Sequence, residues 1–137
     1  MTADCFLDTN ILLYAVSAAP ADRLKSERSQ NLILNTRFAI SAQVIQEFIA
    51  NALRKKELGL RESNIDAFLE LTTLVPVLPI TRELLIQSDL LRRKHKISPW
   101  DATVVAAALE LGCHTLYTED LNHGQNFNGL KVINPLL

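Results

Sequence analysis

The chain has 137 residues, of which 48% are hydrophobic and 21% charged, and its formal net charge is −1. These values are ordinary for a soluble globular protein, and we expect a single domain over residues 1–137 with a core of its own. No apolar stretch approaches the roughly 18 uncharged residues of a membrane span, so we expect no membrane-spanning helix. The first residues lack the features of a signal peptide, so we expect a cytoplasmic protein.

Short apolar runs alternate with helix-length amphipathic segments, a pattern typical of an α/β fold with a parallel sheet. No glycine-rich loop follows the first run, which argues against a Rossmann or P-loop nucleotide site. Cys5 and Cys113 match no disulfide or zinc pattern, and we expect both to be buried thiols. We predict strands near residues 4–7, 37–40, 74–78, 114–117 and 131–134, and helices near residues 10–16, 20–35, 42–57, 62–72, 82–96 and 99–111.

Asp8 ends the first predicted strand and is followed by Thr9 and Asn10. In an open parallel sheet, ligands bind outside the carboxyl ends of the strands, which is the position of Asp8. The alternative is a helix N-cap, since Asp, Thr and Asn all cap helices well. A cap explains only one of the three residues, and Thr9 or Asn10 could provide it. We therefore favour a functional role for Asp8.

Glu47 belongs to the predicted helix 42–57, whose apolar stripe extends to Leu53. Glu47 lies off this stripe, on the polar side with Gln43 and Arg54. Periodicity alone predicts a glutamate that faces solvent. A polar helix face can also line a cleft, and the pattern does not distinguish the two.

Asp101 lies in the predicted helix 99–111, which is apolar nearly all round and therefore resembles a buried helix. A carboxylate in such surroundings needs a specific partner, because burying an unpaired charge is costly. The alternative is a role in the helix start, where an acid can bond back to Ser98 as the cap residue. The two roles are compatible, since first-turn carboxylates point past the helix N-terminus.

Asp120 follows the fourth predicted strand within a polar segment. Taken singly, it is explained by an Asx-type turn closed by Gly124. A functional interpretation gives Thr118 the task of hydrogen bonding to water around a metal ion. Glu119 then offers a substitute ligand, and His123 offers a general base.

The four acids together suggest a chemistry that none of them suggests alone. If folding brings them together, they form an oxygen-lined cage suited to a hard divalent cation. Carboxylates about 5 Å apart repel by on the order of 3 kcal/mol per pair at an effective dielectric of about 20, so we expect the metal ion to stabilise the fold. The residues themselves thus favour a metal-dependent hydrolase.

Other side chains are candidates for RNA contacts. The basic residues Arg54 and Lys55, and Arg92, Arg93 and Lys94, could bind phosphates. Alternatively, they are solvated helix ends whose cations interact favourably with the helix dipole. The only tryptophan, next to Asp101, could stack on a base, but we expect it in the core.

Taken in order, these segments resemble the PIN-domain ribonucleases, and most of all their VapC-type toxins. The resemblance implies a three-layer α/β/α sandwich with a central parallel sheet and the acids at its carboxyl edge. The matching segments are residues 6–12, Glu47 with Phe48, residues 98–102 and residues 116–121. The family's four acidic positions match Asp8, Glu47, Asp101 and Asp120, and its supporting polar positions match Asn10 and Thr118.

The resemblance implies an endoribonuclease that uses Mg²⁺ or Mn²⁺ and attacks the phosphodiester with water, leaving a 5′-phosphate and a 3′-hydroxyl. It also implies a homodimer and a small antitoxin whose tail enters the active-site groove. A phosphatase of the haloacid-dehalogenase type needs a second aspartate two residues after its nucleophile. Asn10 occupies that position here, which argues against such a phosphatase. A non-catalytic PIN-like domain that binds RNA or protein remains the alternative.

Overall fold

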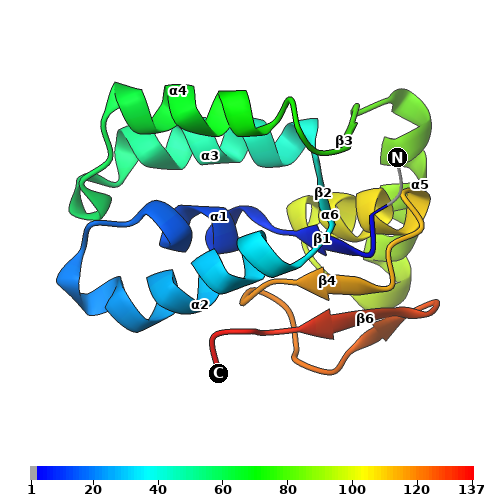
Figure 1. Cartoon of the computed structure of the whole chain (residues 1–137). Helices are drawn as coiled ribbons and strands as arrows, with labels where there is room; N and C mark the ends of the chain where they lie inside the picture. Colours follow the sequence, from blue (N-terminus) through cyan, green and yellow to red (C-terminus); the bar gives the residue numbers. More distant parts are fainter. Residues whose placement is uncertain (1–2) are drawn as a thin grey trace.

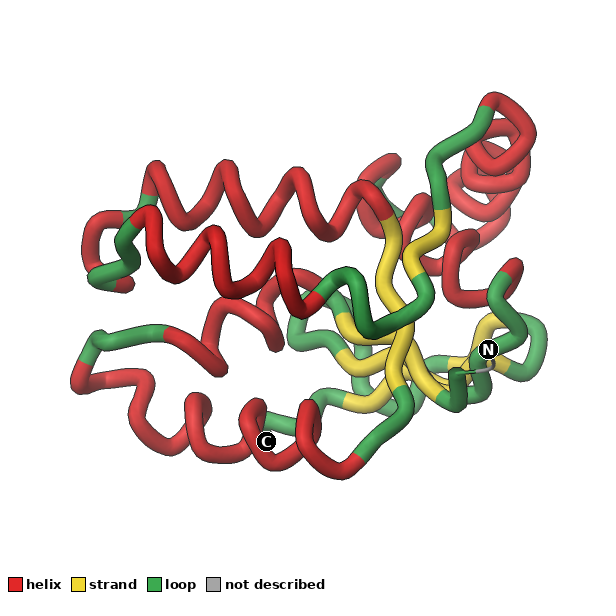
Figure 2. Tube along the Cα trace, turned by 45° about the horizontal axis from the view of Figure 1, so that its top comes forward, coloured by secondary structure: helices red, strands yellow, loops and turns green. Residues whose placement is uncertain are grey.

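The computed structural model describes residues 3–137 and has a six-stranded central sheet with the order β3-β2-β1-β4-β6-β5. Helices flank the sheet on both sides in a three-layer α/β/α arrangement (Figures 1 and 2). The strands are β1 (Cys5–Leu7), β2 (Phe38–Ser41), β3 (Val77–Leu78), β4 (Thr115–Tyr117), β5 (Asn126–Phe127) and β6 (Leu130–Ile133). The helices are α1 (Thr9–Val16), α2 (Arg23–Asn35), α3 (Ala42–Arg54), α4 (Glu62–Leu71), α5 (Arg82–His95) and α6 (Pro99–Glu110), with 3₁₀ turns η1 (Pro20–Asp22) and η2 (Lys56–Leu58).

The strands β1, β2, β3, β4 and β6 pair in parallel, as predicted, while β5 pairs antiparallel with β6. Central strand β1 is buried along its whole length, which explains its uninterrupted apolar sequence. Its neighbours β2 and β4 run parallel to it and therefore end at the same edge of the sheet; the arrows of β1 and β4 point to the left in Figure 1. Polar residues that end these strands or follow them are therefore brought to one edge.

Two helical predictions differ from the structure at helix ends. The predicted helix 20–35 begins as η1, where Pro20 starts a separate short turn before α2. The predicted helix 42–57 ends at Arg54, and η2 follows. Leu53 is 59% exposed, so the prediction that it belongs to the apolar stripe of α3 is wrong.

Side-chain packing in the core explains why α3, α4 and α6 form where the sequence predicts helices. Phe48 of α3 stacks on Phe68 of α4, with ring centroids 3.8 Å apart, and this contact holds the two helices together. In α6, every residue from Ala102 to Ala108 is buried, as its uniformly apolar sequence predicts. Cys5 and Cys113 are buried free thiols, as expected. Within residues 3–137, no helix is both long and apolar enough to cross a membrane.

Candidate active site

Asp8 links the end of β1 to the start of α1 and is only 4% exposed. Its Oδ1 accepts a hydrogen bond of 2.7 Å from the Thr9 backbone N–H, which makes Asp8 the N-cap of α1. Its Oδ2 accepts a bond of 2.8 Å from the Thr118 hydroxyl. Of the three residues that could cap the helix, Asp8 is the one that does so. Asp8 provides the cap and is at the same time held against the end of β4.

Thr118 follows β4, is fully buried, and connects the polar side chains at this edge of the sheet. Besides donating to Asp8, its hydroxyl accepts from Asn10 Nδ2 at 3.3 Å and from the Asp120 backbone N–H at 3.1 Å. Asn10 Nδ2 also donates to Asp120 Oδ2 at 3.1 Å. These bonds join Asp8 and Asp120, which are far apart in the sequence, through Thr118 and Asn10.

Glu47 is half-buried on α3 and points towards α1 rather than into solvent. Its Oε2 accepts from the Thr9 hydroxyl at 3.1 Å, and its Oε1 accepts from Gln43 Nε2 at 3.2 Å. Of the two positions that the pattern left open, Glu47 takes the one that lines a cleft. Because α3 packs against α1, its polar face lines the same edge as Asp8. Gln43, one helical turn before Glu47, is a supporting residue that the sequence reasoning missed.

Asp101 stands in the first turn of α6, half-buried. The Ser98 hydroxyl caps the helix by accepting from the Asp101 backbone N–H at 3.1 Å, so the predicted helix start is confirmed. Burial raises the pKa of the Asp101 carboxyl; a hydrogen bond with Ser98 opposes this rise, and repulsion by Asp120 adds to it. Trp100 is 70% exposed, so the expectation of a core tryptophan is wrong.

Burial and repulsion by neighbouring acids raise the pKa of Asp8 and of Asp101. Burial raises the pKa of Asp8 from its ordinary 3.8 to about 7, against the opposing hydrogen bonds from Thr118 and Thr9. Repulsion by Asp120 and Glu47 adds to this rise. None of the ion pairs formed within residues 3–137 involves Asp8, Glu47, Asp101 or Asp120. The negative charge at this edge is thus not offset by a paired cationic side chain.

The chemistry of these side chains fits a hard divalent cation. All four acids offer oxygen ligands, and Asn10 Oδ1 is buried without a hydrogen-bond partner among the described residues. As placed, no group of three or more Asp, Glu, His or Cys side chains within residues 3–137 is close enough to enclose a metal ion. Binding would therefore require the carboxylates to move towards one another.

Residues 5–125 match the sequence model of the PIN domain. The chain belongs to the PIN-domain family. A search of curated proteins found no match.

Solved structures of toxin–antitoxin proteins share the fold of this PIN domain. A toxin–antitoxin complex from Klebsiella pneumoniae superimposes with a TM-score of 0.68 at 20% identity, covering 96% of this chain and 97% of that one. VapC20 from Mycobacterium tuberculosis, a toxin that cleaves the sarcin–ricin loop, gives 0.69 at 21%, covering 85% and 91%. VapBC-1 from nontypeable Haemophilus influenzae gives 0.62 at 25%, covering 96% and 97%. The resemblance to VapC-type PIN domains is therefore confirmed.

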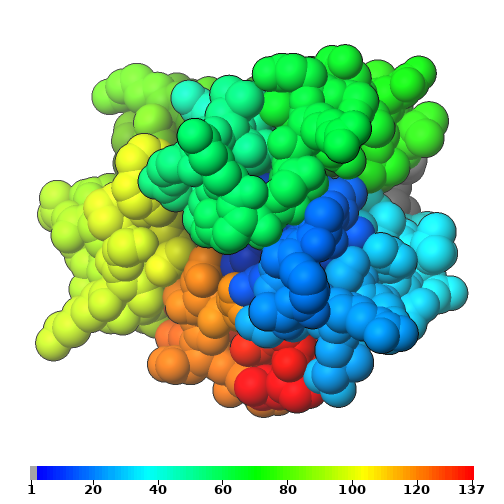
Figure 3. Space-filling view, turned by 90° about the vertical axis from the view of Figure 1, so that its left-hand side faces the viewer, coloured from blue at the N-terminus to red at the C-terminus, as the bar shows by residue number. Residues whose placement is uncertain are grey.

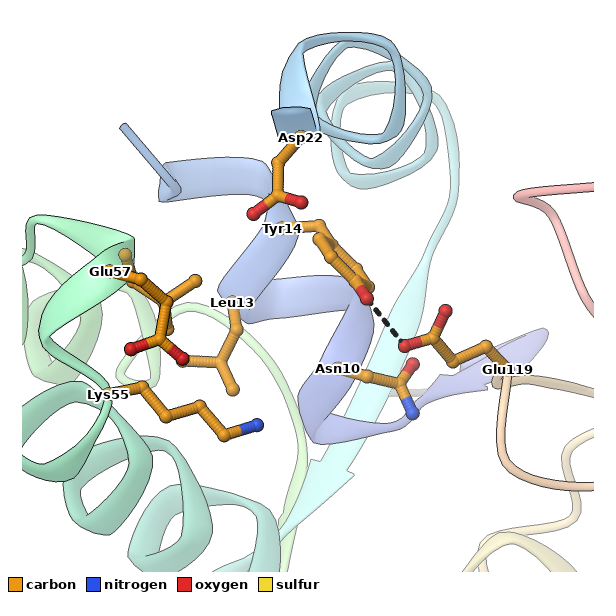
Figure 4. Close-up of a pocket in the computed structure, with 8 residues that line it drawn as sticks. Asn10, Leu13, Tyr14, Asp22, Lys55, Glu57 and Glu119 are labelled. Carbon is orange, nitrogen blue, oxygen red and sulfur yellow. Dashed lines mark hydrogen bonds between the residues drawn. The ribbon is translucent and has the colours of Figure 1, made fainter. Parts of the chain in front are cut away.

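A recess opens at the carboxyl edge of this PIN domain. Figure 3 looks onto that edge and shows dark blue atoms from the start of the chain set back between green, yellow and orange segments. One part of the recess is a cavity of about 220 Å³ (Figure 4). It is lined by Asn10, Leu13, Tyr14, Asp22, Lys55, Glu57, Leu58 and Glu119.

In this cavity, Glu119 contacts α1 and α2. Its Oε1 accepts a bond of 2.7 Å from the Tyr14 hydroxyl (Figure 4). Its Oε2 lies 3.4 Å from Lys25 Nζ. Lys25 also lies over the Tyr14 ring, 4.7 Å from its centroid. Glu119, considered from sequence as a substitute metal ligand, makes these contacts with α1 and α2. The loop histidine, His123, accepts from the Asn134 backbone N–H through Nδ1 at 3.0 Å.

The basic residues fall into two environments. Lys55 lines the cavity with Asn10, and Arg54 lines a second hollow, a groove that includes Glu47. Arg92 and Arg93 stand in the last turn of α5 with Lys94, and both pair with Asp89. Arg54 and Lys55 are thus the basic residues that line hollows next to the candidate acids.

Proposed function

We propose that this PIN domain, acting as one unit over residues 1–137, is a divalent-metal-dependent endoribonuclease and the toxin of a toxin–antitoxin pair. The observation that supports the proposal is the hydrogen-bonded group of Asp8, Thr118, Asn10 and Asp120 at the carboxyl edge of the sheet. Glu47 and Asp101 lie at the same edge, and none of the four acids forms an ion pair within residues 3–137. A site of concentrated, uncompensated negative charge is poorly suited to stability and well suited to binding a metal ion. The fold shared with VapC20, whose name describes an RNA-cleaving toxin, supports RNA as the substrate.

In the proposed site, Asp8, Asp101 and Asp120 hold Mg²⁺ or Mn²⁺, directly or through water, and Glu47 completes the set. When bound, the metal ion offsets charge on the scissile phosphate and makes a coordinated water more acidic. Thr118 fixes the orientation of Asp8 through its hydroxyl, and it also holds the Asp120 backbone.

Glu47 is suited to orient the attacking water, because hydrogen bonds from Thr9 and Gln43 hold its carboxylate in place. Its carboxylate can accept the proton that the water loses as it attacks the phosphorus in line. The leaving group is the 3′-oxygen of the preceding nucleotide, so the products carry a 5′-phosphate and a 3′-hydroxyl. The basic residues Arg54 and Lys55, and secondarily Arg92, Arg93 and Lys94, contact the RNA backbone.

The proposal includes partners. The Klebsiella pneumoniae structure with this fold is named as a toxin–antitoxin complex, and this supports a small antitoxin that covers the acidic edge. We further propose that the active form is a homodimer and that it acts on cytoplasmic RNA.

The test is cleavage of a structured RNA in the presence of Mg²⁺ or Mn²⁺. We expect Asp8→Asn and Asp101→Asn each to lower the cleavage rate at least about 100-fold, because each removes one negative ligand. Asp66→Asn changes an exposed acid on α4 and serves as the matched control, with unchanged cleavage. EDTA should abolish the activity, and sequencing of the product ends should find 5′-phosphates.

Activity that survives both substitutions and EDTA would contradict the metal mechanism. RNA binding without metal-dependent cleavage would instead identify a non-catalytic PIN domain.

A further inference from the structure

The most exposed aromatic side chain adjoining the acidic site is Trp100. It is the only tryptophan of the chain, stands in the first turn of α6 directly before Asp101, and is 70% exposed. Burying a large aromatic ring is favourable, so a ring left in solvent beside a recess is available to bind a ligand.

Trp100 borders a groove of about 510 Å³, within the range of about 300–1,000 Å³ typical of ligand pockets. The groove includes Glu47, so it is continuous with the acidic site. Segments near residue 100 and from α3 lie side by side in Figure 3, where yellow atoms meet the cyan-green ones. The lining residues are Gln43, Gln46, Glu47, Ala50, Asn51, Arg54 and Trp100.

The side chains of this groove offer three kinds of contact. The Trp100 indole offers an aromatic face, and the Gln46 amide and the unpartnered Gln43 Oε1 offer hydrogen-bonding groups. Arg54 offers a cation, which is held by a hydrogen bond of 2.7 Å to Asn51 Oδ1. Unpaired bases are recognised by this combination, in which a ring stacks on the base, polar groups bond to its edge, and a cation binds the phosphate. A protein partner that needs an apolar surface would find few apolar side chains here besides Trp100 and Ala50.

Hydrogen bonds tie this groove to the proposed catalytic carboxylate. Gln43 Nε2 donates both to Glu47 Oε1 and to the Trp100 backbone carbonyl, each at 3.2 Å. The same amide therefore fixes the start of α6, which carries the indole, relative to Glu47. Gln43 is only 7% exposed, and its Oε1 has no hydrogen-bond partner among the described residues. An unpartnered buried acceptor is costly, and a donor from a bound base would satisfy it after a small movement of the side chain.

We propose that this groove binds one unpaired nucleobase of the RNA, next to the scissile phosphate, by stacking on Trp100. The proposal rests on the proposed ribonuclease function and specifies its substrate as an RNA with a single-stranded base at the cleavage site. Arg54 binds the phosphate that follows this base, and the amides of the groove contact its edge. Paired bases are excluded, since both faces of a base within a helix are covered by its neighbours.

The intrinsic fluorescence of the chain tests this proposal directly, because Trp100 is the only tryptophan. The protein carries Asp8→Asn, so that RNA stays intact, and the probe is a short single-stranded oligoribonucleotide of mixed sequence. We expect saturable quenching of the indole emission. The same sequence as a duplex, or as an oligomer of abasic ribose phosphates, should bind through charge and leave the emission unchanged.

Substitutions in the same Asp8→Asn background give a second measurement, the affinity for a labelled single-stranded oligoribonucleotide. Trp100→Leu should weaken binding about 10-fold, the order of magnitude for loss of one stacked base. Trp100→Phe keeps a ring and should stay within about threefold of the parent protein. The matched control is Leu90→Ala, which changes an apolar residue of α5 that is 56% exposed. This variant should bind the oligoribonucleotide like the parent protein.

Unchanged emission on RNA binding, together with unchanged affinity of Trp100→Leu, would overturn the proposal. Emission that responds only to protein concentration or to an added antitoxin would place Trp100 in a protein interface and would also overturn it. Cleavage by the wild-type protein is measured separately. RNA cleavage without quenching of the indole emission would contradict the proposed base-binding groove and leave the proposed ribonuclease function standing. Quenching without cleavage would support the base-binding groove and contradict the ribonuclease function.

Discussion

Thr118 has three hydrogen-bonding contacts at one buried hydroxyl. It donates to Asp8 and accepts from Asn10 and from the Asp120 backbone, so a single oxygen orders three residues of the site. Thr118→Val keeps the shape of the side chain and removes every one of these bonds. We expect the free energy of unfolding to fall by about 2 kcal/mol, since buried polar groups lose their partners. RNA cleavage should fall at least about 10-fold, because Asp8 and Asp120 lose their orientation.

Thr118→Ser is the matched control, because it retains the hydroxyl. It should recover most of the cleavage rate and bind Mn²⁺ as the wild type does. Stability is measured by urea unfolding and metal affinity by titration. Equal activity of the Val and Ser variants would show that the hydroxyl has no positioning role.

Residues of the candidate site differ in how far the sequence predicts them. Asp8 and Asp120 follow apolar strands, and the end of a parallel strand is a ligand-binding position in this fold class. Pattern alone left the position of Glu47 undecided and placed Trp100 wrongly in the core. Helical periodicity separates the core face from the remaining faces, but it cannot distinguish a face in solvent from one that lines a cleft. That distinction depends on which helix packs nearby, here α1 against α3.

At the scale of elements, the hairpin of β5 and β6 is the strand pair that the predicted pattern lacks. Asn128 and Gly129 connect the two strands with φ values of 51° and 97°. Two central residues with positive φ are typical of a type I′ turn, for which Asn-Gly is the favoured sequence. The signal was therefore present in the sequence. The strand itself was not predicted because β5 has only two residues, too few to show an alternating pattern.

Gly129→Ala tests how much this turn contributes to stability. A Cβ at this position would meet no atom within 4 Å, so the cost is strain in the backbone rather than a clash. We expect the free energy of unfolding to fall by about 1 kcal/mol or slightly more, measured by urea unfolding. Cleavage by the folded protein should be unchanged, since the turn carries none of the candidate acids.

Asn128→Gly keeps a residue that tolerates positive φ and is the matched control for this turn. Its stability should lie within about 0.5 kcal/mol of the wild type. Equal stability of Gly129→Ala and the wild type would mean that the turn adopts another conformation in solution.

At the scale of the whole molecule, the fold holds negative charge at one edge of the sheet that no ion pair of residues 3–137 offsets. The architecture was predictable because buried parallel strands have continuous apolar sequences and because the helices between them are long. The distribution of charge could not be predicted from the sequence pattern, because it depends on the topology. The topology brings Asp8, Glu47, Asp101 and Asp120 to one edge of the sheet. Such an arrangement links stability to pH and to metal ions.

We predict that the metal-free protein loses stability as the pH rises from about 4 to about 7. Asp8 keeps its proton in the folded state up to a pKa of about 7, whereas the unfolded chain releases it near the ordinary value of 3.8. Between these values the folded state binds more protons than the unfolded state, so raising the pH favours unfolding. Below pH 4 both states hold the proton, and this contribution to stability is fully present. Thermal unfolding in EDTA at several pH values measures the effect.

Mn²⁺ or Mg²⁺ should reverse this loss, because a bound cation favours the ionised carboxylates and binds only the folded state. The rise in the unfolding midpoint on adding metal should therefore be larger at pH 8 than at pH 5. Asp8→Asn removes the titrating group and should flatten the pH dependence in EDTA, raising the metal-free midpoint at pH 8 by a few degrees. Asp66→Asn, the exposed acid of α4, should leave the whole profile unchanged. A wild-type midpoint in EDTA that stays constant or rises between pH 4 and 7, with the same profile in Asp8→Asn, would show that Asp8 does not carry this coupling.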